Sequence, residues 1–202
     1  MVTIFNKDLK HNIHMHVSGN WRMKVSGLVL FAGVAQFFLF VLIAEAIYPN
    51  YSIANNYISD LGVGSTAYIF NTSIVILGIA IIIGGFFLEK FSTQLRIVLI
   101  LAGIGAMGVG IFPETTGALH TYSSLLVFLM SSIAPYFIIW KLRSTMSLLW
   151  VILGTLGLIS LILYVPGVYL GLGKGGMERL IVYPNIIWVL SFSGWIFGKY
   201  DK

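Results

Sequence analysis

The sequence contains no cysteine, and only 9% of its 202 residues are charged. The absence of cysteine excludes disulfides, thiolate metal sites and cysteine nucleophiles. About a quarter of the residues in an ordinary soluble domain are charged, whereas this chain is 58% apolar and has a mean hydropathy of +0.93. No soluble core could bury that much apolar surface, so the composition predicts a polytopic membrane protein.

Six apolar runs are long enough to form membrane helices, which need about 20 residues each. They cover residues 25–48, 66–88, 96–112, 118–140, 146–170 and 179–198. The first run is too long for a signal peptide and lacks a cleavage site. We therefore predict an all-α fold, a six-transmembrane-helix bundle at 25–198. A cytoplasmic or interfacial tail at 1–24 precedes it, and a cytoplasmic tail at 199–202 follows it.

The lysines and arginines predict the orientation of this bundle. If the N-terminus is inside, ten of them fall in inner segments and only Lys174 and Arg179 fall in outer ones. Cationic loops favour the cytoplasmic side, so we expect both ends in the cytoplasm and a multi-pass protein of the cell membrane. The net charge of +5 fits these loops, so we expect membrane lipids and no nucleic acid as partners. The sequence identifies no protein partner.

Polar residues gather at the opposite, outer face. Most of the acids lie there, and His120 falls about one turn into the fourth run, near the same face. Three outer segments carry them: NNYISDLGVG at 55–64, PETTGALH at 113–120 and GGMERL at 175–180. The candidate catalytic residues are His120, Asp60 and Glu114, and the candidate ligand-binding residues are Ser59, Asn56, Ser124, Glu178 and Arg179.

This outer cluster supports two hypotheses. In the first, the protein is a carrier, sensor or assembly partner, whose cluster binds a lipid headgroup or small amphiphilic ligand or braces the helix ends. In the second, it is a membrane-embedded, hydrolase-like enzyme acting on a lipid or amphiphile. His120 would then be the general base, oriented by Asp60 or Glu114. Arg179 would be clamped by one of those acids or would bind an anionic headgroup. Whether the protein is an enzyme stays open.

Two further motifs have simpler interpretations. GIGAMGVG at 103–110 has the spelling of a dinucleotide-binding loop, but it lies inside a membrane run, where glycines favour close helix packing. The histidines His11, His14 and His16 have a spacing that suits neither a helix face nor a strand, so a solvated tail is favoured over a metal site. We predict no metal and no cofactor.

Three short motifs follow one another along the chain: ISDLG after the first run, PE followed by His120, and ERL at the start of the last run. With these motifs in this order, the chain resembles a family of six-span prokaryotic membrane proteins, domain of unknown function 998. The resemblance covers about residues 25–198 and implies a six-helix fold without an established activity. The matching residues are Ser59, Asp60, Gly62, Pro113, Glu114, His120, Glu178 and Arg179. A looser similarity links the chain to membrane hydrolases that include alkaline ceramidases. Their zinc site needs three histidines and the runs here hold one, so such a site is disfavoured.

Overall fold

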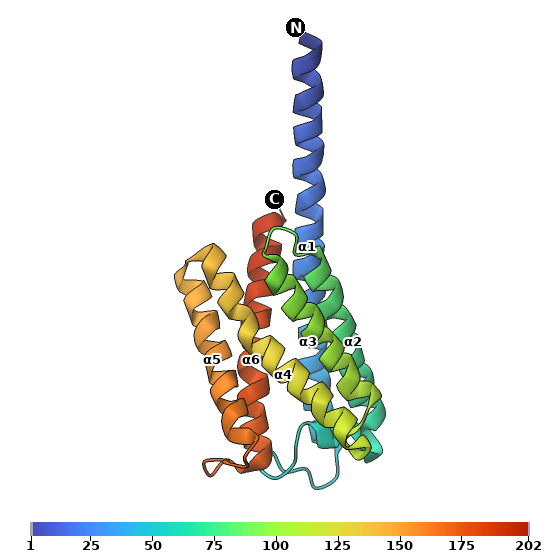
Figure 1. Ribbon diagram of the computed structural model, residues 1–202. Helices are drawn as coiled ribbons and strands as arrows, with labels where there is room; N and C mark the ends of the chain where they lie inside the picture. Colours follow the sequence, from blue (N-terminus) through green and yellow to red (C-terminus); the bar gives the residue numbers. More distant parts are fainter. Residues whose placement is uncertain (1, 202) are drawn as a thin grey trace.

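The computed structural model describes residues 2–201, with side chains from residue 20 onward. Within this range the chain forms six α-helices and three short 3-10 turns. The helices are α1 (Val2–Ile47), α2 (Ala67–Phe87), α3 (Thr93–Ile111), α4 (Ala118–Leu142), α5 (Thr145–Tyr164) and α6 (Gly173–Tyr200) (Figure 1). Each has a segment long and apolar enough to cross a membrane, so the predicted all-α, six-span fold is confirmed.

The six helices close into a ring. Each helix packs against the next one in the chain, and α1 also packs against α6. The chain termini and the α2–α3 and α4–α5 connections lie at one end, which we call the terminal end (Figure 1). The other three connections lie at the opposite end, the loop end. They contain the 3-10 turns η1 (Ser59–Gly62), η2 (Gly64–Thr66) and η3 (Glu114–Thr116).

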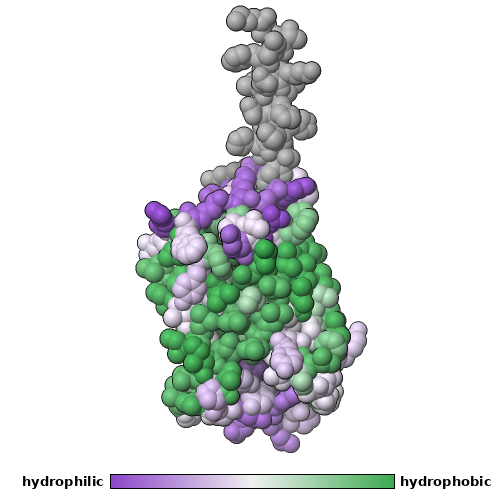
Figure 2. All heavy atoms as spheres, in the orientation of Figure 1, coloured by the Kyte–Doolittle hydropathy of each residue, from purple (hydrophilic) through white to green (hydrophobic). Residues whose placement is uncertain are grey.

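The surface of the bundle has the polarity expected of a membrane protein. Figure 2 shows a broad band of hydrophobic side chains with hydrophilic side chains at both ends. At the terminal end, Arg22 pairs with Glu89 at 2.9 Å and Lys24 pairs with Asp201. The assignment of the terminal end to the cytoplasm stays a prediction.

The predicted span boundaries agree with the helix ends to within about three residues, except at the start of the first span, the end of the fifth and the start of the sixth. The fifth span ends at Tyr164 rather than residue 170, because Pro166 and the positive-φ residue Gly167 (φ 81°) break the helix while the sequence stays apolar. The sixth begins at Gly173 rather than residue 179, since its first turns are too polar and glycine-rich to register as a membrane run. At the other end of the chain, α1 starts at Val2. The side chains of the tail histidines lie outside the described residues.

The GIGAMGVG segment is a helix-packing surface, as predicted. A Cβ on Gly103 would lie 2.7 Å from the carbonyl oxygen of Gly78 on α2, and a Cβ on Gly105 would lie 2.6 Å from the backbone nitrogen of Val127 on α4. Because these neighbours are backbone atoms, the helices approach closely only where the side chain is hydrogen. Glycines on two faces of α3 therefore let it pack between α2 and α4.

Candidate functional site

The segment after α1 is a hydrogen-bonded turn structure rather than an open loop. The Asp60 carboxylate accepts hydrogen bonds from the backbone N–H of Tyr57 at 3.0 Å and from the Asn56 amide at 2.9 Å. The Asn56 side-chain oxygen in turn accepts from the N–H of Ser52 at 3.0 Å. Asp60 and Asn56 therefore stabilise the loop that leads into η1, the usual role of such side chains in turns.

Arg179 on α6 is buried and ties this loop to two helices. One terminal nitrogen, Nη1, donates to the carbonyl oxygens of Ile53 and Gly175, both at 2.9 Å, and to that of Asn56 at 3.3 Å. The other, Nη2, pairs with Glu45 at the end of α1 and donates to the Tyr51 hydroxyl at 2.7 Å. We call Glu45, Tyr51 and Arg179 the arginine brace.

Tyr51 completes the brace as a protonated hydroxyl. It donates to the carbonyl oxygen of Tyr57 at 2.8 Å while it accepts from Arg179. Burial raises the pKa of Tyr51 above its ordinary value, although the nearby Arg179 opposes this shift. The hydroxyl therefore stays a donor at neutral pH. Arg179 has Glu45 as its carboxylate partner, so of the alternatives considered for Arg179 the clamp by Asp60 or Glu114 is wrong.

Two glycines allow α6 to start against the loop. Gly173 has φ 75°, a conformation that other residues rarely adopt. A Cβ on Gly175 would lie 1.9 Å from the carbonyl oxygen of Asn56, and the Gly175 N–H donates to Ala54 at 2.9 Å. The GKGG sequence is thus the reason that Arg179 can reach the loop carbonyls.

A cavity of about 90 Å³ lies inside the ring, between α1, α2, α3, α4 and α6. Most of its lining is apolar, and five of its lining residues are polar. The lining residues are Val34, Phe37, Ile58, Ser59, Phe70, Ile74, Leu77, Ile81, Ala106, Val109, Ser124, Val127, Phe128, Ser131, Glu178, Val182, Asn185, Ile186 and Val189. None of the described ionisable side chains except Glu178 lines it, which makes Glu178 the centre of its chemistry.

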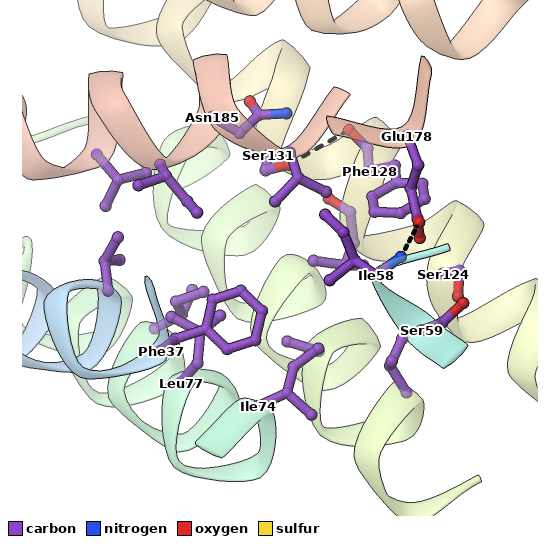
Figure 3. A pocket seen from close by; sticks show the side chains of 18 of the residues that line it. Phe37, Ile58, Ser59, Ile74, Leu77, Ser124, Phe128, Ser131, Glu178 and Asn185 are labelled. Atoms are coloured by element: carbon purple, nitrogen blue, oxygen red, sulfur yellow. Dashed lines mark hydrogen bonds between the residues drawn. The ribbon is translucent and has the colours of Figure 1, made fainter. Parts of the chain in front are cut away.

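The polar groups of the cavity are concentrated toward the loop end. The Glu178 carboxylate accepts a hydrogen bond from the backbone N–H of Ile58, just before η1 (Figure 3). The hydroxyls of Ser59 and Ser124 point toward one another beside it. Deeper in the cavity, the Ser131 hydroxyl donates to the carbonyl oxygen of Val127 on its own helix at 2.7 Å. Glu178, Ser59 and Ser124 thus form the polar mouth of a cavity whose remaining lining is mostly apolar.

A polar contact joins α4 to α6 deeper in the bundle. The Asn185 amide donates to the Ser132 hydroxyl at 2.9 Å, and its oxygen accepts from the Trp188 indole at 2.9 Å. Each helix carries a proline beside this contact, Pro135 on α4 and Pro184 on α6. Asn185 therefore satisfies its polar groups within the membrane region while it closes the wall of the cavity.

Two acids that were predicted to be catalytic lie close to each other at the loop end. Burial raises the pKa of Glu114 to about 7, and the neighbouring Asp60 carboxylate contributes to this rise, while Lys174 acts in the opposite direction. The Lys174 ammonium lies 4.1 Å from the centre of the Tyr57 ring. Asp60, Glu114 and Lys174 form a charged rim next to the mouth.

His120 occupies a separate position. It is buried, and its Nδ1–H donates to the carbonyl oxygen of Phe112 at 2.8 Å. Among the described residues, neither Asp60 nor Glu114 forms a hydrogen bond or ion pair with it, and His120 does not line the cavity. The structure therefore does not bring the predicted catalytic group together around a cavity, and a catalytic His120 stays a prediction.

The structure separates the predicted cluster. Ser59, Ser124 and Glu178 form the mouth, and Asp60 and Glu114 belong to the rim. Arg179 belongs to the brace, Asn56 to the loop before η1, and His120 lies apart from all of them. Tyr51 and Asn185 were not predicted as partners of these residues. The position of Glu45 at an outer helix end was visible in the sequence, but its pairing depends on the course of the loop between α1 and η1.

The family comparison agrees with this architecture. The model of the family described as Protein of unknown function (DUF998) matches residues 31–194, a range that reaches into every helix of the ring. Comparisons with curated proteins and with solved structures find no significant match. The match covers most of the chain, so this six-span membrane protein belongs to the DUF998 family.

Proposed function

We propose that this protein binds one slender apolar chain of a membrane amphiphile in the cavity inside the helix ring. The polar end of the amphiphile lies at the mouth, next to Ser59, Ser124 and Glu178. The observation that carries this proposal is the distribution of polarity along the cavity lining, which has Glu178, Ser59 and Ser124 at the loop end and is mostly apolar below it, where Ser131 and Asn185 form hydrogen bonds within the protein (Figure 3). An amphiphile has the same distribution of polarity along its length.

The depth of the cavity supports a chain from one leaflet. Glu178 and Val189 both line it and lie 11 residues apart on α6, which corresponds to roughly 16 Å of helix. The hydrocarbon core of a bilayer is about 30 Å thick. The lining thus extends from the helix ends to about the middle of the membrane, the depth of one lipid tail.

The volume of the cavity favours a narrow ligand. At about 90 Å³ it is several times larger than the space a water molecule needs, and it is smaller than the engineered cavity of about 150 Å³ that binds benzene. A dodecyl chain is larger than this volume, so its binding requires the lining side chains to move apart, and a single unbranched chain needs a smaller displacement than a fused ring system. Filling it with methylene groups replaces empty space by dispersion contacts, which stabilises the complex.

The arginine brace contributes to this function indirectly. It fixes the loop between α1 and η1, and this loop delivers the Ile58 N–H to Glu178 and Ser59 to the mouth. The loop between α1 and η1 therefore connects the brace with the proposed binding site. Helix bracing and ligand binding, predicted as alternatives, are assigned here to different residues.

The proposal is tested with variants of one helix. Val182→Phe on α6 adds bulk to a residue that lines the cavity, whereas Ile187→Phe adds a ring to a side chain that is 54% exposed on the same helix. The full-length protein in a maltoside detergent is incubated with dodecanol, and native mass spectrometry counts the bound molecules. We expect one dodecanol per chain in the wild type and in Ile187→Phe, and a large loss of binding in Val182→Phe.

Thermal unfolding of the ligand-free variants serves as a control for folding. Equal dodecanol binding by Val182→Phe and Ile187→Phe, with both variants folded, would show that the chain does not occupy the cavity, and the proposal would then be abandoned.

A further inference from the structure

We infer that the mouth of the cavity selects amphiphiles whose head is a protonated amine over those with an anionic head. This inference rests on the proposed function, because it concerns the same cavity, and it names the class of ligand. Its basis is the burial of Glu178, the hydrogen bonds at its carboxylate and the charges around it.

Glu178 is the ionisable side chain that the cavity presents to a ligand. It is 4% exposed and lines the cavity. Among the described residues, the Ile58 N–H is the one hydrogen-bond donor to its carboxylate. A carboxylate has about four acceptor positions, so most of its capacity is left over. A buried carboxylate gains most from a partner that carries both a positive charge and N–H donors.

Arg179, the nearest cation in the sequence, does not serve as that partner. It is adjacent to Glu178, and neighbouring residues on a helix do not face one another. Its charge is paired with Glu45, and both of its terminal nitrogens donate to the brace and the loop. Glu178 is therefore left without a cationic side chain as a hydrogen-bond partner among the described residues.

The rim places two further acidic side chains next to the mouth. The Asp60 and Glu114 carboxylates are near enough to act on the charge of Glu178. Lys174 lies near Glu114, and its ammonium is placed over the Tyr57 ring. An ammonium at the mouth would stabilise the ionised forms of Glu178 and the rim acids, whereas an anionic head would oppose them. The ammonium would hydrogen-bond to Glu178, with Ser59 and Ser124 as further acceptors.

The test compares heads on an identical tail. Dodecylamine, dodecanol and dodecyl phosphate are each incubated at pH 7.5 with the full-length protein in a maltoside detergent, and native mass spectrometry measures the bound fraction. Glu178→Gln is the informative variant, because the glutamine carbonyl can still accept from the Ile58 N–H while the charge is removed. Glu89→Gln removes a carboxylate at the terminal end, far from the cavity, and is the matched control.

We expect the wild type and Glu89→Gln to bind dodecylamine about tenfold more tightly than dodecanol, and dodecyl phosphate more weakly than both. In Glu178→Gln the preference for the amine should vanish while dodecanol binding persists. Equal affinity for the three heads, or an amine preference that survives Glu178→Gln, would overturn the inference and leave the apolar-chain proposal intact. Failure of the proposed function would give a different result: Val182→Phe would not reduce the binding of dodecanol.

Discussion

Glu178 and Arg179 are consecutive in the chain and opposite in charge, yet each has different partners. Consecutive residues on a helix point about 100° apart, so one can face the cavity while the other faces the loop after α1. Arg179 donates hydrogen bonds to Glu45, Tyr51 and three backbone carbonyl oxygens. Glu178 accepts one hydrogen bond, from a backbone N–H, and lines the cavity. At the residue scale, the contacts of Arg179 therefore indicate a role in stability, and the proposed function assigns Glu178 to ligand binding.

The burial of the brace predicts a large effect on stability. Glu45→Gln leaves the charge of Arg179 without a counter-charge in a place where the two side chains are 6% and 11% exposed. We expect it to lower the free energy of unfolding by about 3 kcal/mol. Glu89→Gln removes the acid of an exposed arginine pair and should cost less than about 1 kcal/mol. Unfolding in mixed micelles, followed by tryptophan fluorescence, measures both, and losses of equal size would contradict the assigned role of the brace.

The raised pKa of Glu114 predicts a pH dependence of stability. Burial and the neighbouring Asp60 carboxylate move this pKa from 4.5 to about 7, so the folded protein holds the proton more tightly than the unfolded chain. Stability should therefore fall as the pH rises from 4.5 to about 7. Glu114→Gln removes the titrating group and should flatten this slope when melting temperatures are compared across the pH range. An unchanged slope in the variant would show that other groups cause the dependence.

At the scale of helices, α3 is held between two neighbours by glycines on both of its faces. A Cβ added at Gly103 or Gly105 would come within 3 Å of backbone atoms of α2 or α4. Close packing of this kind leaves no room for relaxation. The α3 segment is also short, at 19 residues, so its stability in the membrane depends on these two interfaces.

Gly105→Ala is expected to destabilise the bundle by about 1–3 kcal/mol, since the added methyl group would overlap the backbone of α4. Gly194→Ala is the matched control, because no atom lies within 4 Å of a Cβ at that position on α6. The free energy of unfolding in detergent distinguishes them. A similar small effect of both substitutions would mean that α3 and α4 are less closely packed than described.

The helices were largely predictable from sequence, whereas the partners of the polar residues were not. Hydropathy located each span because lipid exposure requires an apolar surface. It failed at Gly173, where the helix begins in a polar, glycine-rich segment held by the loop. The common face of Ser59, Asp60, Glu114 and Glu178 followed from counting spans. The pairing of Arg179 with Glu45 did not, because it depends on how the residues between α1 and η1 fold back.

For the whole molecule, the charge distribution predicts the orientation in the membrane. The chain has no cysteine, so a single introduced cysteine reports on one position. Thr115 lies at the loop end and Asp201 at the terminal end, and both residues are exposed. The two test variants are Thr115→Cys and Asp201→Cys. We expect a membrane-impermeant maleimide to label the first in intact cells and the second only after permeabilisation. The reverse pattern would contradict a cytoplasmic terminal end and place the mouth of the cavity in the other leaflet.

The proposal that an apolar chain lies inside the helix ring, with its head at Glu178, is best tested by locating the tail of a bound ligand. Crystals of the full-length protein grown with dodecanol that carries a terminal bromine would show the bromine by anomalous scattering. We predict one peak at the deep end of the cavity, among Val34, Ile81 and Val189. A peak only on the outer, lipid-facing surface of the bundle, with the cavity free of bromine, would contradict the proposal.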